Sequence, residues 1–313
     1  MKIVITGALG HIGSRLIREL PLSFPGAAIV MIDNMMTQRY CSLFGLPKDG
    51  DFRFIETDIT QTDPAPLLEG AHVVIHLAAI TDAAGSFDRA EQLEQNNFNA
   101  TRRVAEACAS LGIRLFTLST TSVYGTQKEV VDEECSEEDL KPQSPYATTK
   151  LKEERLVQQL VRDNGMKASV FRFGTIFGVS PGIRFHTAVN KFCWQAAIGQ
   201  PITVWSTAYE QKRPYLDVGD ACRAVEHIVR NDLFDGRIYN VLTLNATVRQ
   251  IVETIQEFIP GLSIRFVDSP IMNQLSYEVR DTRFRSTGFT PKGNLEQAIR
   301  EELGLFLPIH KDR

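Results

Sequence analysis

The sequence predicts an α/β protein with a doubly wound parallel sheet and a smaller α/β lobe towards the C-terminus. Short apolar strands alternate with helical segments through the first half of the chain, which is typical of a parallel sheet covered by helices. The segment 72–77 is apolar on both faces, as expected for a strand in the middle of such a sheet. A chain of 313 residues is long enough for one large domain and a lobe.

The first predicted strand, residues 2–6, runs into a glycine-rich turn. Gly7, Gly10 and Gly13 follow at intervals of three, and apolar residues recur at helical spacing from His11 onward. A strand, a glycine turn and a helix form the context in which the pyrophosphate of a dinucleotide binds at a helix N-terminus. The spacing is GxxGxxG rather than GxGxxG, and a tight turn without a ligand is the alternative interpretation.

A second predicted strand, residues 28–32, ends at Asp33. A carboxylate there can accept hydrogen bonds from both hydroxyls of an adenosine ribose and would repel a 2′-phosphate, which favours NAD over NADP. Arg39 nearby favours NADP by contrast. The alternative role for Asp33 is to cap the turn that follows the strand.

The third and fourth predicted strands, residues 52–55 and 72–77, also end in candidate site segments. Asp58 follows the third strand and is placed to cap a turn or to accept a hydrogen bond from an adenine amino group. Ala78 follows the fourth strand, and so small a residue lets a flat ring pack against the backbone. His76 is interpreted as a packed core histidine, because nothing near it completes a metal site or a catalytic triad.

A long helix over 93–111 and a fifth strand over 115–119 complete this half, and Thr120 follows that strand. Ligands of parallel sheets bind beyond the carboxyl ends of the strands. The turn glycines, Asp33, Ala78 and Thr120 all fall at those ends, so they are expected to meet at one site.

Tyr146 and Lys150 begin a predicted helix that continues to about residue 163. Four residues apart, they share one helix face. A phenol has a pKa of about 10, and a neighbouring ammonium group and a helix N-terminus favour its ionised form. Tyr146 is therefore a candidate general base for a sugar hydroxyl, with Thr120 aligning the same oxygen. The spacing recurs at Tyr124 and Lys128, where Gly125 and a strand end argue against a helix.

Together these features resemble the extended short-chain dehydrogenases/reductases, and more closely the NAD-dependent nucleotide-sugar epimerase/dehydratase group. The resemblance is strong to about residue 180. It implies a Rossmann-type domain, NAD as cofactor and a nucleotide-diphosphate sugar as substrate. It also implies a catalytic set of Thr120, Tyr146 and Lys150. The implied cofactor site comprises Gly7, Gly10, His11, Ile12, Gly13, Asp33, Asn34, Asp58, Ile59, Leu77, Ala78, Ala79, Asn97 and Lys150.

The resemblance also suggests which reaction is catalysed. The 4,6-dehydratases of this family carry Asp-Glu directly after the catalytic threonine, whereas this chain has Thr121 and Ser122, neither of which can abstract a C5 proton. C4 epimerisation needs only hydride removal, rotation of the keto sugar and hydride return. We therefore expect a nucleotide-sugar 4-epimerase. A C4 dehydrogenase, a 4-keto reductase and, from another class, a non-catalytic NAD sensor are the alternatives.

The second half of the chain is expected to bind the substrate. Thr175 stands where the family generally has a substrate-contacting asparagine, which makes a standard UDP-galactose pose doubtful. Arg213 and Arg280 match diphosphate ligands, and His186 lies on an expected lobe helix. The implied substrate site comprises Thr81, Ser122, Thr175, His186, Arg213 and Arg280. The predicted division is a cofactor domain over 1–175, with 215–245 packing back onto it, and a lobe formed by 176–214 and 246–313.

Composition and charge indicate which partners and which cellular location to expect. A formal net charge of −4 argues against binding to nucleic acid, and no apolar run is long enough to cross a membrane. Five scattered cysteines without a CxxC pair indicate a reducing compartment and no structural metal site. A strand that starts at the first residues leaves no room for a signal peptide, so a cytoplasmic location is expected. The helices at 93–111 and 146–163 resemble those with which the family forms a homodimer.

Overall fold

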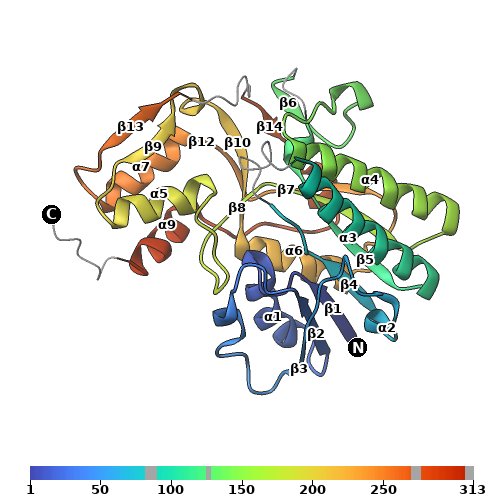
Figure 1. Cartoon of the computed structure of the whole chain (residues 1–313). Coiled ribbons are helices and arrows are strands. Elements are labelled where there is room, and N and C mark those ends of the chain that lie inside the picture. The colour runs from blue at the N-terminus through green and yellow to red at the C-terminus, as the bar shows by residue number, and fades with distance from the viewer. Residues whose placement is uncertain (82–89, 125–127, 269–275, 307–313) are drawn as a thin grey trace.

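The computed structural model describes residues 1–81, 90–124, 128–268 and 276–306, and a large parallel sheet forms its centre (Figure 1). Within these ranges the sheet has seven strands in the order β11-β7-β5-β4-β1-β2-β3, and every neighbouring pair is parallel. The predicted fold class is confirmed. The strands are β1 (Lys2–Thr6), β2 (Ala28–Asp33), β3 (Asp51–Glu56), β4 (Val73–His76), β5 (Arg114–Thr120), β7 (Ala168–Phe173) and β11 (Ile238–Val241).

Helices cover both faces of the sheet, as alternation of strand side chains requires. Ile3 and Ile5 of β1 pack in one cluster with α1 (His11–Ser23) and α6 (Val218–Arg230). Val4 points to the opposite face and belongs to a second cluster with α3 and α4. The helices of that second face are α2 (Ala65–Leu68), α3 (Ala90–Leu111) and α4 (Pro145–Asn164).

The strand and helix predictions for this half are correct to within a few residues. The predicted strand 72–77 is shorter in the structure, because β4 pairs with β1 only from Val73 to His76. The predicted helices at 93–111 and 146–163 are α3 and α4, and each extends slightly beyond its predicted bounds. Strand β11, which lies within residues 215–245, is an edge strand of the large sheet.

The smaller part of the molecule is built from short strands and helices around its own apolar core (Figure 1). Its strands form two small sheets, in the orders β12-β10-β8 and β13-β9. They are β8 (Thr175–Phe177), β9 (Ile202–Trp205), β10 (Lys212–Asp217), β12 (Leu244–Thr247) and β13 (Ile264–Val267). Its helices are α5 (Ala188–Ala197), α7 (Val248–Phe258) and α9 (Leu295–Gly304). Strands β6 (Val130–Val131) and β14 (Glu278–Val279) form a separate pair, and α8 (Thr282–Arg285) is a single turn.

Aromatic rings bind the later strands of the large sheet together. The ring of Phe171 on β7 stacks on Phe116 of β5 with centroids 4.6 Å apart and on Tyr239 of β11 at 5.5 Å. Phe284 packs edge-on against Phe171 at 6.1 Å. Since Phe171 is fully buried and joins three strands, it is a central part of this core.

We expect Phe171→Ala to lower the free energy of unfolding by about 3–5 kcal/mol, because it opens a cavity among these rings. Urea unfolding followed by circular dichroism measures the loss. The matched control is Phe44→Ala at a side chain that is 69% exposed, which should change stability by no more than about 0.5 kcal/mol. Similar losses in the two variants would contradict this description of the core.

Candidate active site

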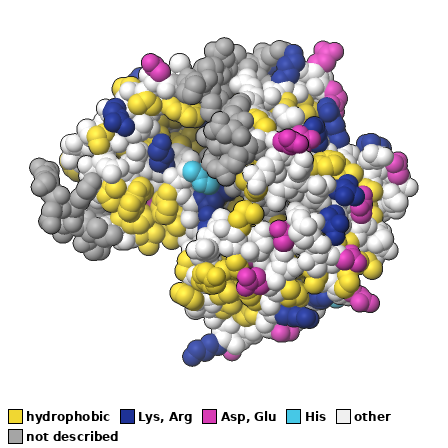
Figure 2. Space-filling view, in the orientation of Figure 1, with side chains coloured by type: hydrophobic (Ala, Val, Ile, Leu, Met, Phe, Trp, Pro, Cys, Tyr) yellow, Lys and Arg dark blue, Asp and Glu magenta, His cyan; other side chains and the backbone are white. Residues whose placement is uncertain are grey.

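A cavity of about 500 Å³ lies where the carboxyl ends of β1, β2, β4 and β5 face the smaller part of the molecule. Figure 2 shows the hollow between the two parts, with basic and histidine side chains at the junction. Most of the residues predicted for the site line it. They are Gly7, Gly10, His11, Ile12, Gly13, Asp33, Asn34, Asp58, Ile59, Leu77, Ala78, Ala79, Thr81, Thr120, Ser122, Tyr146, Thr175 and His186.

The glycine turn lies against the backbone of the segment that directly follows β4. Gly7 has a φ of +67°, and a Cβ placed on it would lie 2.6 Å from the Ala78 nitrogen. A Cβ on Gly13 would lie 2.6 Å from the carbonyl oxygens of Gly7 and Ala8. Only glycine fits such contacts, so both positions serve close packing of the turn against α1 and β4.

The N-terminus of α1 opens into the cavity. Gly10 is the N-cap residue and supplies no side-chain hydrogen bond to the first turn. His11 is buried, and its Nε2 lies 2.8 Å from the Gly178 carbonyl oxygen, to which it must donate. Burial and the nearby Arg184 charge lower the pKa of His11 to about 3, so the ring is neutral at physiological pH. Unpaired N–H groups at a helix N-terminus suit a pyrophosphate, and the turn therefore fits a dinucleotide.

The two acids predicted for the adenosine end line the cavity and also cap turns. Asp33 accepts hydrogen bonds from the backbone nitrogens of Leu9 at 3.1 Å and Met35 at 3.0 Å. Asp58 accepts from the nitrogen of Thr60 at 2.8 Å. Burial raises the pKa of Asp58, but hydrogen bonds from Thr60 outweigh this effect and the net shift is downward. Both carboxylates are thus held in place beside the cavity.

Asn97 is fully buried and lies behind the cavity wall instead of in it. Its side chain accepts from the Ile80 nitrogen at 2.8 Å and donates to the Ile80 carbonyl oxygen at 2.8 Å. This pair fixes the segment that follows β4, whose residues Ala78 and Ala79 do line the cavity. Asn97 therefore contacts the backbone of the cavity wall, and its place in the cofactor site stays a prediction.

Tyr146 reaches the cavity because of the local sequence at the start of α4. The Ser144 hydroxyl accepts from the Ala147 nitrogen at 3.2 Å as N-cap, and Pro145 occupies the first helical position. Tyr146 then faces the cavity opposite Thr120, at the end of β5. The Thr120 hydroxyl accepts from the Ser122 nitrogen at 3.1 Å, which leaves its own proton available to a ligand.

Lys150 lies one turn further along α4 and is buried beneath Tyr146, outside the cavity lining. Its Nζ pairs with Glu153 Oε2 at 2.8 Å. Burial lowers the pKa of Lys150, but the negative charges of Glu153 and of an ionised Tyr146 outweigh this effect, and the net shift is upward. Lys150 therefore stays charged next to the phenol.

A second buried acid anchors the same helix to the sheet. Glu154 accepts from Arg172 Nε at 2.9 Å and from Arg172 Nη2 at 2.6 Å. The Ser119 hydroxyl donates to Glu154 Oε1 at 2.5 Å. Neither Glu153 nor Glu154 was identified from the sequence. A signal was present, because residues seven and eight positions after Tyr146 return to its helix face.

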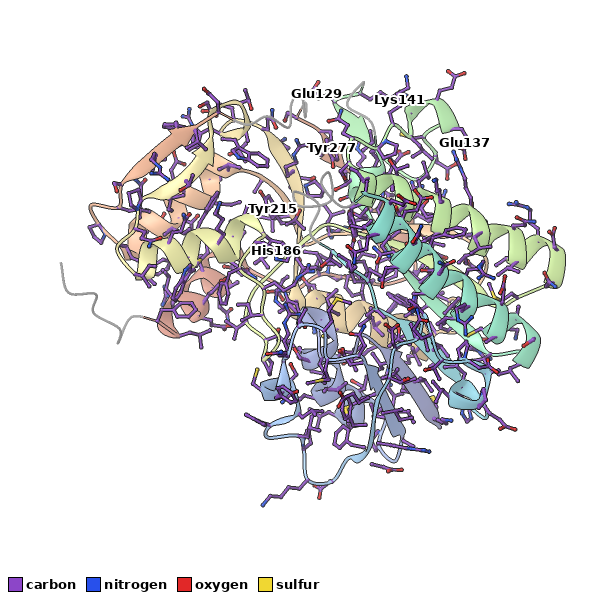
Figure 3. The ribbon with its side chains drawn as sticks, viewed as in Figure 1. Glu129, Glu137, Lys141, His186, Tyr215 and Tyr277 are labelled. Carbon is purple, nitrogen blue, oxygen red and sulfur yellow. The ribbon has the colours of Figure 1, made fainter. Side chains whose placement is uncertain are left out.

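The substrate side of the cavity is only partly as predicted. Thr81, Thr175 and His186 line it, although His186 precedes α5 and does not lie on it (Figure 3). Arg184, which the sequence analysis did not single out, also lines it, and its guanidinium donates to Thr81 Oγ1.

Arg213 and Arg280 lie outside the cavity lining. Arg213 is on β10, with its guanidinium 4.9 Å from the centre of the Tyr277 ring. Arg280 is exposed, and its backbone bonds to Val131 and Asn240. Their roles as diphosphate ligands remain predictions.

The interpretation of His76 as a core histidine is confirmed. His76 is a buried core residue whose ring nitrogens contact Thr6 Oγ1 at 2.7 Å and Thr101 Oγ1 at 3.1 Å. Tyr124, the first residue of the second Tyr–Lys spacing, is buried and donates to Asn240 Oδ1 at 2.9 Å. Residues 125–127 of that segment lie outside the described residues.

Across the part of the chain that the structure describes, no helix could span a membrane and no cluster of His, Cys, Asp or Glu could hold a metal ion.

A glycine turn, a helix N-terminus and a tyrosine that share one cavity define a dinucleotide-dependent enzyme of the α/β class. The model of the NAD dependent epimerase/dehydratase family matches residues 3–241, and the chain belongs to this family. NAD is its cofactor.

Individual relatives agree with this assignment. The uncharacterized UDP-glucose epimerase YtcB of Bacillus subtilis (strain 168) is 30% identical over 267 residues, which cover 82% of each chain. The trifunctional UDP-glucose 4,6-dehydratase/UDP-4-keto-6-deoxy-D-glucose 3,5-epimerase/UDP-4-keto-L-rhamnose-reductase RHM2 of Arabidopsis thaliana is 29% identical. That match covers 96% of this chain and 46% of the relative, so the chain spans about half of the relative's length.

A solved structure matches nearly the whole chain. It is the UDP-glucuronic acid 4-epimerase from Bacillus cereus, in complex with UDP-glucuronic acid and NAD. The TM-score is 0.88 at 25% sequence identity, and the match covers 98% of this chain and 99% of that chain.

We expect Gly13→Ala to weaken NAD binding at least tenfold, because its methyl group would push α1 away from the carbonyl oxygens of Gly7 and Ala8. Calorimetric titration with NAD measures the change. The control is Gly304→Ala, where an added Cβ meets no atom within 4 Å and binding should be unchanged. Unaltered affinity in a folded Gly13→Ala protein would show that the turn does not hold the cofactor.

Proposed function

We propose that this enzyme interconverts the C4 epimers of a UDP-linked sugar by transient oxidation at C4. The observation that carries the proposal is that Tyr146 and Thr120 line the same cavity as the glycine turn. When bound there, NAD would supply the acceptor and donor for the C4 hydride. The relatives named UDP-glucose epimerase and UDP-glucuronic acid 4-epimerase support UDP as the nucleotide and C4 as the reacting carbon.

Tyr146 is the proposed acid/base, acting on the C4 hydroxyl. Its phenolate takes the hydroxyl proton during oxidation. After the keto intermediate has rotated and hydride has returned to the other face of C4, Tyr146 gives the proton back to the C4 oxygen. Lys150 stabilises the phenolate by its buried charge, and Thr120 donates a hydrogen bond that aligns the reacting oxygen. Asp33 is the proposed ligand of the adenosine ribose, and Asn34, Asp58 and Ile59 complete that end of the cofactor site.

The charges along the cavity support an epimerase over a dehydratase. In the described part of the cavity wall the acids are Asp33 and Asp58, which lie at the predicted adenosine end. Ser122, two positions after Thr120, also lines this wall, and among the described lining residues no other carboxyl group is present to remove a C5 proton. Arg184 and His186 line the other end and suit an anionic ligand such as a nucleoside diphosphate.

We further propose the domain division predicted from the sequence, a homodimer formed through α3 and α4, and a cytoplasmic location. The division is supported by the strand pairing, because β11 joins the large sheet while β8 and β10 pair with each other in the smaller one. Sedimentation velocity of the purified protein tests the dimer.

Tyr146→Phe is expected to lower turnover about 10²–10⁴-fold and to leave NAD binding unchanged, because only the proton-transferring oxygen is removed. UDP-glucose and UDP-glucuronic acid are the first substrates, with C4 epimers detected by NMR. Tyr209→Phe, which removes a hydroxyl outside the cavity lining, is the control and should retain full activity.

Absorbance of NADH distinguishes the alternatives in the same assay. An epimerase returns every hydride, so no NADH accumulates with product. NADH formed in proportion to product would instead identify a C4 dehydrogenase. Full activity of Tyr146→Phe would refute the proposed acid/base.

A further inference from the structure

We propose that Glu153 is a positioning residue that holds the ammonium group of Lys150 and offsets part of its charge at Tyr146. This inference rests on the proposed role of Tyr146 as acid/base. Glu153 does not line the cavity and is 1% exposed, so it acts through Lys150 and not on the substrate.

Two donors converge on a single oxygen of Glu153. Lys150 Nζ and Thr101 Oγ1 each lie 2.8 Å from Oε2, while the buried Oε1 has no hydrogen-bond partner among the residues that the structure describes. An ammonium group and a hydroxyl that donate to the same oxygen favour the ionised carboxylate. Burial raises the pKa of Glu153 on balance, although the Lys150 charge and the hydrogen bonds from Lys150 and Thr101 oppose that shift.

A chain of hydrogen bonds continues from Glu153 to the cavity wall, and its direction is fixed at both ends. Since Thr101 donates to Glu153, His76 Nε2 must donate to Thr101, at 3.1 Å. Then His76 Nδ1 is the acceptor for the Thr6 hydroxyl at 2.7 Å, and Thr6 Oγ1 accepts from the Ala78 nitrogen at 3.3 Å.

The ring at the centre of this chain is neutral. Burial and the Lys150 charge lower the pKa of His76 to about 3, which agrees with one donor and one acceptor nitrogen. The chain therefore fixes Glu153, and through it Lys150, relative to the β1 and β4 ends that form the floor of the cofactor cavity.

Within the described ranges, the other charged groups near Tyr146 and Lys150 are paired, neutral or across the cavity. On α4, Glu154 is paired with Arg172 of β7, so its charge is largely offset. From β4, His76 is neutral, and across the cavity Arg184 and His186 come from the segment before α5. Glu153 is thus the carboxylate whose removal changes the net charge beneath the phenol most directly.

Glu153→Gln tests the proposal, because it keeps the shape of the side chain and its acceptor oxygen but removes the charge. With the negative charge gone, the phenolate is favoured, and Tyr146 should ionise at a lower pH than in the unmodified protein. The acidic limb of the kcat profile should move by the same amount, with KM for the sugar nearly unchanged.

The ionisation is read without turnover, which separates this proposal from the proposed activity. Near-ultraviolet absorbance is titrated in NAD-saturated protein, and the matching Tyr146→Phe protein is subtracted to isolate the phenolate of Tyr146. The control is Glu94→Gln on the neighbouring helix α3. This change removes the same charge from an exposed ion pair with Lys152 of α4, and it should leave the titration of Tyr146 unchanged.

An unshifted titration in folded Glu153→Gln would overturn the proposal, whether or not the enzyme epimerises sugars. If Glu153→Gln does not fold, Glu153→Asp takes its place, because the shorter carboxylate weakens contact with Lys150. A smaller shift in the same direction then supports the proposal, and a titration identical to that of the unmodified protein overturns it.

Discussion

The buried contact of Glu154 with Arg172 and Ser119 determines where the chemistry of this protein can take place. Helix α4 carries Tyr146, and its placement against the sheet relies on one carboxylate that joins it to β7 through Arg172 and to β5 through Ser119. Burial alone lowers the pKa of Arg172, but the Glu154 charge outweighs this and raises it. A pair so fully desolvated is costly to break from one side, by about 3–5 kcal/mol.

The reactive groups follow from that anchor. Ser119 immediately precedes Thr120, so the same carboxylate that fixes α4 also fixes the end of β5. Tyr146 lies about two turns from Glu154 on the same helix face, which brings the phenol opposite Thr120. The parallel sheet supplies the remaining requirement, because it places the glycine turn at the same edge. The catalytic tyrosine and the cofactor site therefore lie at the same edge of the sheet. Among the described residues no cluster could ligate a metal ion.

Much of this arrangement could be predicted from sequence, because it depends on local signals. The turn glycines, the strand ends at Asp33 and Ala78, and the start of α4 are each specified by neighbouring residues, and the edge at which parallel strands end is common to all of them. Their predicted meeting at one cavity requires no detailed side-chain packing.

The parts that were missed depend on contacts between distant segments. Glu153 resembles an ordinary helix-surface charge in the sequence, and its burial follows from Thr101, 52 positions earlier. Arg184 was overlooked because it stands in an irregular segment, and His186 was placed on a helix that starts only at residue 188. Short strands in the smaller part, such as β8 with three residues, are too brief for a periodic signal.

Transfer of a C4 label tests the central claim most directly, namely that one hydride leaves and re-enters the sugar in the cavity beside Tyr146. The enzyme is incubated with a UDP-sugar deuterated at C4, and the C4 epimer is analysed by mass spectrometry and NMR. The account predicts that the product keeps its deuterium at C4 and that no hydrogen from water enters there. Loss of the label to solvent would contradict it.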